Sequence, residues 1–413
     1  MNLGALIRIF GRIGILSFGG PAAQIALMHK ELVETRPLLS EQQFLRALSF
    51  CMLLPGPEAM QLATYAGWRL RGITGGLIAG LLFVLPGAVV ILALALSYAS
   101  YGGLDWVQAV FLGIKSVVVI IVIEALLKIS KRALKRPAHW AIALLSFVAI
   151  FVFSIPFPVI ILTAGIIGAF LSVQDPPDTA APVAFTDTLT QIAIWSAVWL
   201  LPLGLIYAVD PEFLGPLGAF FSKLAMVTFG GAYAVLAYMT QAVVGDLGWL
   251  TTAEMMDALG LAETTPGPLI LVTEFVGILA GFREGGLGLA LLAGLVTLWA
   301  TFAPCFLWIF AGAPYIDWLA SRPRLAAALG AITAAVVGVI LNLMLWFALH
   351  LLFDALHTQS FGFGAVLLPE LTSLQWTPAL LALGAGYLML VRHMNLIVVL
   401  CIGGLAGFAT TLI

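Results

Sequence analysis

Two short motifs built from glycine and proline interrupt apolar stretches of this chain, and each of them occurs twice. Phe18-Gly19-Gly20-Pro21 recurs as Phe229-Gly230-Gly231, and Pro55-Gly56-Pro57 recurs as Pro266-Gly267-Pro268. Both repeats have an offset of 211 residues, from Phe18 to Phe229 and from Pro55 to Pro266. Glycine adopts backbone angles that end a helix, and proline suits the first turn of a new one. The spacing therefore predicts four helix breaks, two in each copy of a duplicated unit.

A helix that starts at such a break can bind an anion. It exposes up to four unpaired amide donors, and its macrodipole places about half a positive charge there. We expect an anion site where the breaks meet, and the nearby hydroxyl, amide and phenol groups either donate to the anion or bond helix carbonyls. The candidate substrate-binding residues are Ser17, Phe18, Gly19, Gly20, Pro21, Pro55, Gly56, Pro57, Gln61, Thr228, Phe229, Gly230, Gly231, Tyr233, Thr265, Pro266, Gly267 and Pro268. The alternative is that the glycines and prolines merely permit close packing and kinks, as they often do in membrane helices.

Cations stand at equivalent positions before two of the breaks. Arg12 and Lys223 each lie seven residues before a motif glycine, Gly19 and Gly230 respectively. Seven residues are about two helical turns, or roughly 10 Å. These cations either draw an anion toward the breaks or anchor the segment at the membrane interface.

Ionisable side chains also lie within or beside the apolar segments. The carboxyl groups of Glu58, Glu263 and Glu274 flank the breaks. A carboxylate there repels an anion unless it is protonated or paired, so we hypothesise that one of the three couples proton movement to anion movement. The alternative is a salt bridge to a nearby arginine. Lys115 and Glu124 share one apolar segment, are too far apart for a simple helical pair, and are functional candidates with partners open on other helices.

The composition determines the fold class. The 413 residues are 62% hydrophobic and only 9% charged, whereas soluble proteins carry about 25% charged residues. Apolar runs of about 20 residues recur along the chain, and the alternating ten-residue segments of a membrane barrel do not dominate. We therefore predict an all-α polytopic membrane protein, whose first segment is retained because it lacks a clean small-residue cleavage site.

We divide the chain into a first copy (1–172), a linker with one connecting transmembrane helix (173–212) and a second copy (213–413). The predicted segments number about thirteen, in line with the bilayer thickness. They are roughly 3–30, 42–71, 74–100, 105–128, 138–153, 156–172, 188–208, 213–244, 251–284, 286–312, 325–350, 376–391 and 394–412. Whether the broken segments cross or re-enter the membrane is left open.

The Lys/Arg bias between the segments changes sign from one copy to the other. The loop at 128–136 holds five cations, whereas its counterpart at 351–375 holds none. Conversely, the loop at 101–105 has no cation and its counterpart at 317–324 has two arginines. Cytoplasmic loops are enriched in Lys and Arg, so the second copy should be inverted, with the N-terminus inside and the C-terminus outside. Inverted repeats with broken helices at the midplane are a transporter architecture.

These motifs resemble the chromate ion transporter family in its long, two-domain form. The resemblance lies in the four motifs, in the run Gln61–Gly72 after the first proline motif, and in Gly277, which matches Gly67. It implies a bacterial inner-membrane protein with two homologous halves of opposite orientation, which exports chromate and confers chromate resistance. One position departs from the pattern: Ala232 stands where Pro21 follows the first glycine pair.

We therefore predict a secondary transporter, and not an enzyme, that exports a tetrahedral divalent oxyanion, with chromate as the expected substrate. The sequence contains no phosphate-binding loop and no zinc-ligand spacing, so we expect no catalytic residue, cofactor or metal. The alternatives are a sulfate or other oxyanion importer, a membrane scaffold without transport, and an intramembrane enzyme. The expected partners are the oxyanion and the lipid bilayer, with no nucleic acid, and a homodimer is left open.

Overall fold

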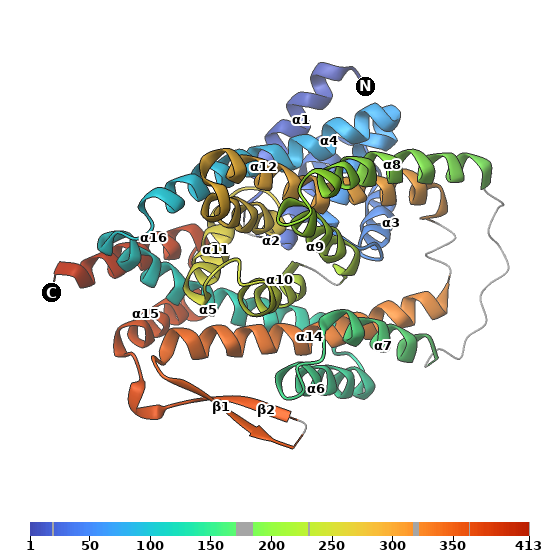
Figure 1. The fold of residues 1–413 in the computed structure, drawn as a ribbon. Coiled ribbons are helices and arrows are strands. Elements are labelled where there is room, and N and C mark those ends of the chain that lie inside the picture. The colour runs from blue at the N-terminus through green and yellow to red at the C-terminus, as the bar shows by residue number, and fades with distance from the viewer. Residues whose placement is uncertain (19, 171–184, 230–231, 317–321, 363, 413) are drawn as a thin grey trace. The chain divides into compact units, whose positions relative to one another are not determined.

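The computed structural model describes residues 1–18, 20–170, 185–229, 232–316, 322–362 and 364–412 (Figure 1). Gly19, Gly230 and Gly231 of the predicted site, and most of the linker, lie outside these residues. The chain forms two compact units. Unit 1 comprises Met1–Leu96, Ser172–Val235 and Thr265–Ala326, and unit 2 comprises Ser97–Leu171, Leu236–Thr264 and Ala327–Ile413. Each unit therefore takes segments from both predicted copies.

Unit 1 contains the beginning of each predicted copy. Its helices are α1 (Leu3–Leu16), α2 (Gly20–His29), α3 (Glu41–Cys51), most of α4 (Glu58–Tyr101), α8 (Phe185–Val209), α9 (Leu214–Val227), the start of α10 (Ala232–Gln241), and α12 (Val272–Gly312). Short turns at Lys30–Glu34, Leu269–Leu271 and Ala313–Tyr315 complete it. Helix α12 packs against α8 and α9, and Trp199 of α8 is buried against Ala303 and Leu307 of α12.

Unit 2 contains the end of each predicted copy. Its helices are the end of α4, α5 (Asp105–Ala133), α6 (Pro137–Phe151), α7 (Phe157–Phe170), the end of α10, α11 (Thr252–Thr264), α14 (Pro323–Leu352), α15 (Trp376–Gly386) and α16 (Leu396–Ala409). Turns at Ala242–Asp246, Tyr387–Val391 and Thr410–Leu412 follow α10, α15 and α16. Helices α5 and α16 approach closely, since a Cβ on Gly113 would lie 1.9 Å from the Gly403 carbonyl oxygen.

An antiparallel hairpin in unit 2 departs from the otherwise helical fold. Strand β1 (Leu356–Phe361) pairs with β2 (Gly364–Pro369), and Leu356 lies opposite Pro369. The sequence analysis did not predict it, because β1 is largely polar and exposed and lacks the alternation of a half-buried strand. The rest of the described chain confirms the prediction of an all-α fold.

Five of the described helical stretches are long and apolar enough to cross a membrane. They are Glu58–Tyr101, Asp105–Ala133, Thr188–Val209, Leu269–Tyr315 and Pro323–Leu352. Shorter apolar helices of 10–17 residues accompany them. Large hydrophobic side chains such as Leu162 and Leu201 are exposed on these helices, as a lipid-facing surface requires. The fold is that of a multi-pass helical membrane protein.

The order of elements from α1 to α5 recurs from α9 to α14. In both series a helix is followed by a break, a helix with a π-turn, another helix, a second break and a long kinked helix. The kinks have nearly the same backbone angles, with φ 62° and ψ −157° at Gly72 and φ 71° and ψ −160° at Gly286. The local structure is thus duplicated along the chain, in agreement with the duplicated motifs.

Candidate functional site

The helices of unit 1 are interrupted where the motifs predicted. Helix α1 ends at Leu16 and α2 begins at Gly20, while α9 ends at Val227 and α10 begins at Ala232. The two proline motifs stand immediately before a helical turn, because α4 begins at Glu58 and the turn before α12 begins at Leu269. Those two starts are 211 residues apart, like the motifs themselves.

The central glycine of each proline motif has left-handed backbone angles. Gly56 has φ 116° and Gly267 has φ 87°. Side chains with a Cβ rarely adopt such angles, so glycine is required at both positions. At Gly56 space is also lacking, since a Cβ would lie 2.9 Å from Gln61 Nε2 and 3.0 Å from Cys305 Sγ.

Each proline motif is hydrogen-bonded to the Phe-Gly-Gly break of the other copy. The Gly56 amide donates to the Thr228 carbonyl oxygen at 2.8 Å, and the Gly267 amide donates to the Ser17 carbonyl oxygen at 2.8 Å. Gly267 follows Gly56 by 211 residues, and Thr228 follows Ser17 by the same number. The same bond is therefore made twice with the copies exchanged, and we call the two the crossed bonds.

The hydroxyl residue before each Phe-Gly-Gly motif ends its own helix. Ser17 Oγ donates to the Ile13 carbonyl at 2.6 Å, and Thr228 Oγ1 donates to the Leu224 carbonyl at 2.6 Å. Helix ends leave such carbonyls without an intrahelical partner, and a hydroxyl four residues on can satisfy one. Of the two uses that the sequence left open for these hydroxyls, the structure shows the bond to the helix.

The long kinked helices cover the proline motifs in the same exchanged manner. A Cβ on Gly87 of α4 would lie 2.2 Å from the Pro266 carbonyl oxygen, and Cys305 of α12 lies against Gly56. Gly87 and Cys305 each follow a helix proline, Pro86 and Pro304. Each copy thus contributes the second half of its long helix to the break of the other.

Two glutamine side chains, both from the first copy, donate hydrogen bonds to carbonyl groups of the two proline motifs. Gln24 Nε2 donates to the Gly267 carbonyl at 2.7 Å, and Gln61 Nε2 donates to the Pro55 carbonyl at 2.7 Å. Both glutamines are at most 1% exposed, and their Oε1 atoms accept no hydrogen bond from the described residues. Two buried amide oxygens therefore lie beside the breaks without a donor among the described residues, whereas buried amide oxygens are nearly always satisfied. Gln24 is one of the amide side chains near the breaks for which the sequence left open donation to an anion or to a helix carbonyl, although it is not among the candidate substrate-binding residues.

Because the crossed bonds already use two glycine amides, they limit which backbone amides at the breaks can bind an anion. The amides of Gly56 and Gly267 are engaged with carbonyls. The first intrahelical bond after each motif is made by Gln61 and by Leu271, so the amides of Ala59, Met60, Leu269 and Ile270 precede it. These four residues are buried. In this form, which we call closed, the first-turn amides at the two proline motifs are therefore shielded from solvent.

The predicted charged residues lie in different surroundings. Arg12 Nε is 3.6 Å from Glu31 Oε1, and Arg36 contacts the same buried carboxylate. Lys223 is exposed. Glu274 is buried, and its Oε2 accepts no hydrogen bond from the described residues. Of the other two carboxyl groups, Glu263 lies in α11 of unit 2 and Glu58 begins α4. Among the predicted polar site residues, Thr265 is buried at the second proline motif, whereas Tyr233 is half-buried in α10.

Comparison with known proteins gives the family. A family model described as "Chromate transporter" matches residues 4–169 and again residues 216–408. The chain belongs to the chromate transporter family. This transporter is 32% identical over 345 residues to a probable chromate transport protein of Synechococcus elongatus, with 82% of this chain and 83% of the relative covered. It is 30% identical over 340 residues to a chromate transport protein of Cupriavidus metallidurans, covering 82% and 81%.

A third relative spans nearly the whole transporter. A chromate transport protein of Pseudomonas aeruginosa is 28% identical over 413 residues, covering 99% of this chain and 92% of the relative. No solved structure matches. The family confirms the resemblance drawn from the motifs, and it places the chain among transporters rather than enzymes.

Proposed function

We propose that this transporter exports chromate, a tetrahedral divalent oxyanion, across a bacterial inner membrane and so confers chromate resistance. The relatives' names support the substrate. The crossed bonds carry the proposal for the site, because they join the four breaks of unit 1 into two equivalent pairs. Export of a dianion needs no ATP, since an inside-negative potential favours it by about 2.3 kcal/mol per charge at 100 mV.

The site in this proposal comprises the predicted motif residues and the first-turn amides beside them. In the closed form the Gly56 and Gly267 amides bond carbonyls of the other copy. Opening one pair would release a glycine amide and expose the buried amides of the first turn, such as Ala59 and Met60. Neutral amides at a helix start bind an oxyanion without a dedicated base. Anion oxygens and partner carbonyls would then compete for the same donors, which couples binding to the opening of a break.

The membrane arrangement in this proposal is a pair of inverted repeats, residues 1–172 and 213–413, joined by one helix, with about thirteen crossings. Exchange of identical bonds between the copies is the pattern that a pseudo-two-fold axis produces. An axis in the membrane plane relates inverted repeats, whereas an axis along the membrane normal relates parallel ones. The change in Lys/Arg bias between the copies supports the in-plane axis.

The test is counterflow in liposomes. Liposomes that contain the purified transporter and are loaded with unlabelled chromate should accumulate labelled chromate from outside. Inhibition of this uptake by excess external sulfate reports whether the site also accepts sulfate. We expect Gly56→Ala and Gly267→Ala to slow counterflow similarly, by about tenfold or more, because each strains one proline motif. Gly204→Ala is the matched control, since nothing lies within 4 Å of its Cβ.

Two results would contradict the proposal. Absence of chromate counterflow in the unaltered transporter would remove chromate as the substrate. Full counterflow in folded Gly56→Ala and Gly267→Ala proteins, each monodisperse in detergent, would remove the breaks as the site.

A further inference from the structure

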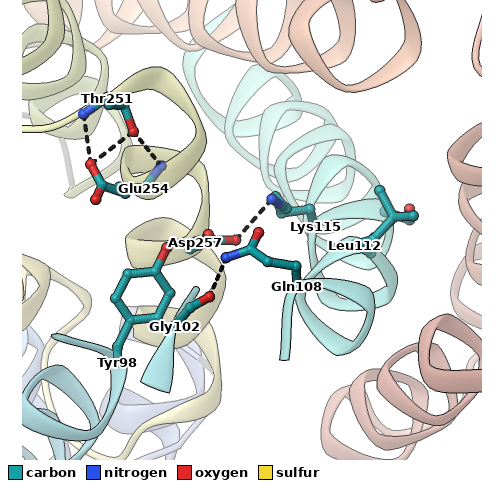
Figure 2. A network of polar contacts seen from close by, with 9 residues as sticks. Tyr98, Gly102, Gln108, Leu112, Lys115, Thr251, Glu254 and Asp257 are labelled. Atoms are coloured by element: carbon teal, nitrogen blue, oxygen red, sulfur yellow. Dashed lines mark hydrogen bonds and ion pairs between the residues drawn. The ribbon is translucent and has the colours of Figure 1, made fainter. Parts of the chain in front are cut away.

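A buried cluster of ionisable side chains in unit 2 lies apart from the glycine and proline motifs. Lys115 Nζ is 3.0 Å from Asp257 Oδ1, and the side chains are 10% and 0% exposed. The Tyr98 hydroxyl donates to the other carboxylate oxygen, Oδ2, at 2.6 Å. Figure 2 shows the three side chains converging from α5, from α11 and from the end of α4. The sequence singled out Lys115 but not its partner.

The surroundings of Asp257 also contain a second carboxyl group. Besides Lys115 and Tyr98, the Glu254 carboxylate interacts with Asp257 electrostatically. The Glu254 carboxylate accepts the Thr251 amide at 2.8 Å and the Thr251 hydroxyl at 2.7 Å, at the start of α11 (Figure 2). Gln108 is neutral and donates to the Gly102 carbonyl at 2.5 Å. Lys115 is therefore the cation that balances Asp257.

A structural role alone does not explain this pair well. The free-energy cost of removing two charges from water often exceeds the attraction between them. Apolar residues of similar volume therefore stabilise a fold as much as a buried ion pair does, or more. The contact to Oδ1 is an ion pair rather than a well-directed hydrogen bond. Lys115 lies in α5, which is long and apolar enough to cross a membrane, and ionisable groups in such segments are rare and mark substrate or ion pathways.

We propose that this cluster is a second contact for the transported oxyanion, in addition to the breaks of unit 1, and that it binds a proton on Asp257 together with the anion at Lys115. The proposal rests on the oxyanion transport proposed above and adds its coupling ion. The ion pair has no net charge, so an anion that approaches Lys115 meets the competing carboxylate. A proton from solution on Asp257 removes that competition and leaves a buried cation without a counterion. An anion oxygen then replaces the carboxylate beside Nζ, and no covalent bond other than the carboxyl O–H is formed.

Proton and anion therefore favour each other's binding, as linkage requires. A chromate dianion that travels with one proton carries one net negative charge instead of two. The membrane potential still drives its exit, with half the force. The number of charges moved per anion thus distinguishes the coupled from the uncoupled transporter.

The experiment measures the potential at which anion flux reverses. Liposomes containing the transporter hold a tenfold chromate gradient and no pH gradient, at a pH where chromate is a dianion. The same measurement is then made with a tenfold sulfate gradient. One net charge predicts reversal near about 59 mV, and two predict about 30 mV. We expect the first value for the unaltered transporter and the second for the Lys115→Gln/Asp257→Asn double variant, which keeps the volume and removes both charges.

The control uses an ion pair on the same helix. Lys128 Nζ lies 2.5 Å from Glu124 Oε1 at the surface, so Lys128→Gln/Glu124→Gln should leave the reversal potential unchanged. Reversal near 30 mV in the unaltered transporter overturns the proposal, as does a double variant that still reverses near 59 mV. A transporter without any chromate or sulfate counterflow refutes the proposed function instead.

A second variant tests the cluster if the double variant does not fold. Tyr98→Phe keeps the ring, which packs edge-on against Phe111 at 5.2 Å between centroids, and removes only the hydroxyl. The carboxylate of Asp257 then loses a donor, so its protonation becomes easier. The curve of chromate KM against pH should move to higher pH by about one unit. An unchanged curve overturns the proposal, since a merely structural tyrosine would not affect the pH profile.

Discussion

The amide of Gly56 donates to the carbonyl oxygen of Thr228 at 2.8 Å, and this bond joins the two copies of the repeat. Its counterpart from Gly267 to Ser17 has the same length and the same direction between motifs. A single bond of this kind could arise from packing of unrelated loops. Two such bonds with the copies exchanged require that the copies face each other through the same surface, as in an isologous contact.

Because Gly87 of α4 packs closely against the second proline motif, a single added methyl group there should destabilise the protein. Gly87→Ala places a Cβ 2.2 Å from the Pro266 carbonyl oxygen, which is backbone and cannot turn aside. We expect destabilisation of about 1–3 kcal/mol, measured as a lower thermal midpoint in detergent. Gly204→Ala has no atom within 4 Å of its Cβ and should be neutral or slightly stabilising. An equally stable Gly87→Ala protein would show that α4 does not cover this motif.

The repeated hydroxyl bonds predict equal effects at two distant positions. Ser17→Ala and Thr228→Val each leave a buried helix carbonyl without its donor, at an expected cost of about 1–3 kcal/mol. Ser49 makes the same type of bond to Leu45 on an exposed part of α3, so Ser49→Ala should cost under about 0.5 kcal/mol. Thermal unfolding of the three proteins gives the comparison. A large effect at one of the two positions and none at the other would contradict the equivalence.

Local patterns in the sequence were sufficient to locate the breaks. Glycine and proline leave a signature that depends only on neighbouring residues, so the starts of α4 and of the turn before α12 fell next to Pro57 and Pro268. The composition likewise gave the helical membrane class. The predicted segment boundaries between 71 and 74 and between 284 and 286 fall at the non-helical residues inside α4 and α12, where the structure has a kink within one helix instead of a gap between two.

These local patterns could not predict which residues far apart in the sequence contact each other. Nothing near Gly56 specifies that its amide meets Thr228, because that contact follows from packing of segments far apart in sequence. Asp257 was missed for the same reason, since only the fold brings α11 beside Lys115. Gln24 is the intermediate case: its type and position were suggestive, but its partner Gly267 belongs to the other copy.

The π-turn after α2 predicts a pH-dependent loop. His29 Nε2 contacts Glu41 at 2.7 Å and Nδ1 contacts Glu34 at 3.1 Å. The hydrogen bond to Glu41 raises the pKa of His29, and it outweighs partial burial, which lowers it. A raised folded-state pKa means that the charged form stabilises the fold fully below the unfolded value of about 6.5 and that this stability is lost as pH rises through the folded value.

We therefore expect residues 30–41 to loosen as pH rises above about 6.5, seen as faster amide hydrogen exchange after correction for the intrinsic rate. His29→Gln should abolish this pH dependence. His139 is the control, because its ring bonds the Ala133 carbonyl rather than a carboxylate, and His139→Gln should leave the dependence in place. Protection that rises with pH would have the opposite sign and would exclude the His29 contacts as its cause.

The proposed inversion of the second copy predicts opposite accessibility for two loops that are counterparts in the repeat. Lys131 lies in the cation-rich segment at the end of α5, and Gln359 lies in the β1–β2 hairpin within the cation-free counterpart. In a background with Cys401→Ser, which removes the exposed native cysteine, Gln359→Cys should react with an impermeant maleimide on intact cells. Lys131→Cys should react only after the membrane is permeabilised, because cytoplasmic loops carry the Lys/Arg excess. Reaction of both from the same side would make the repeats parallel, and the axis that exchanges the crossed bonds would then run along the membrane normal.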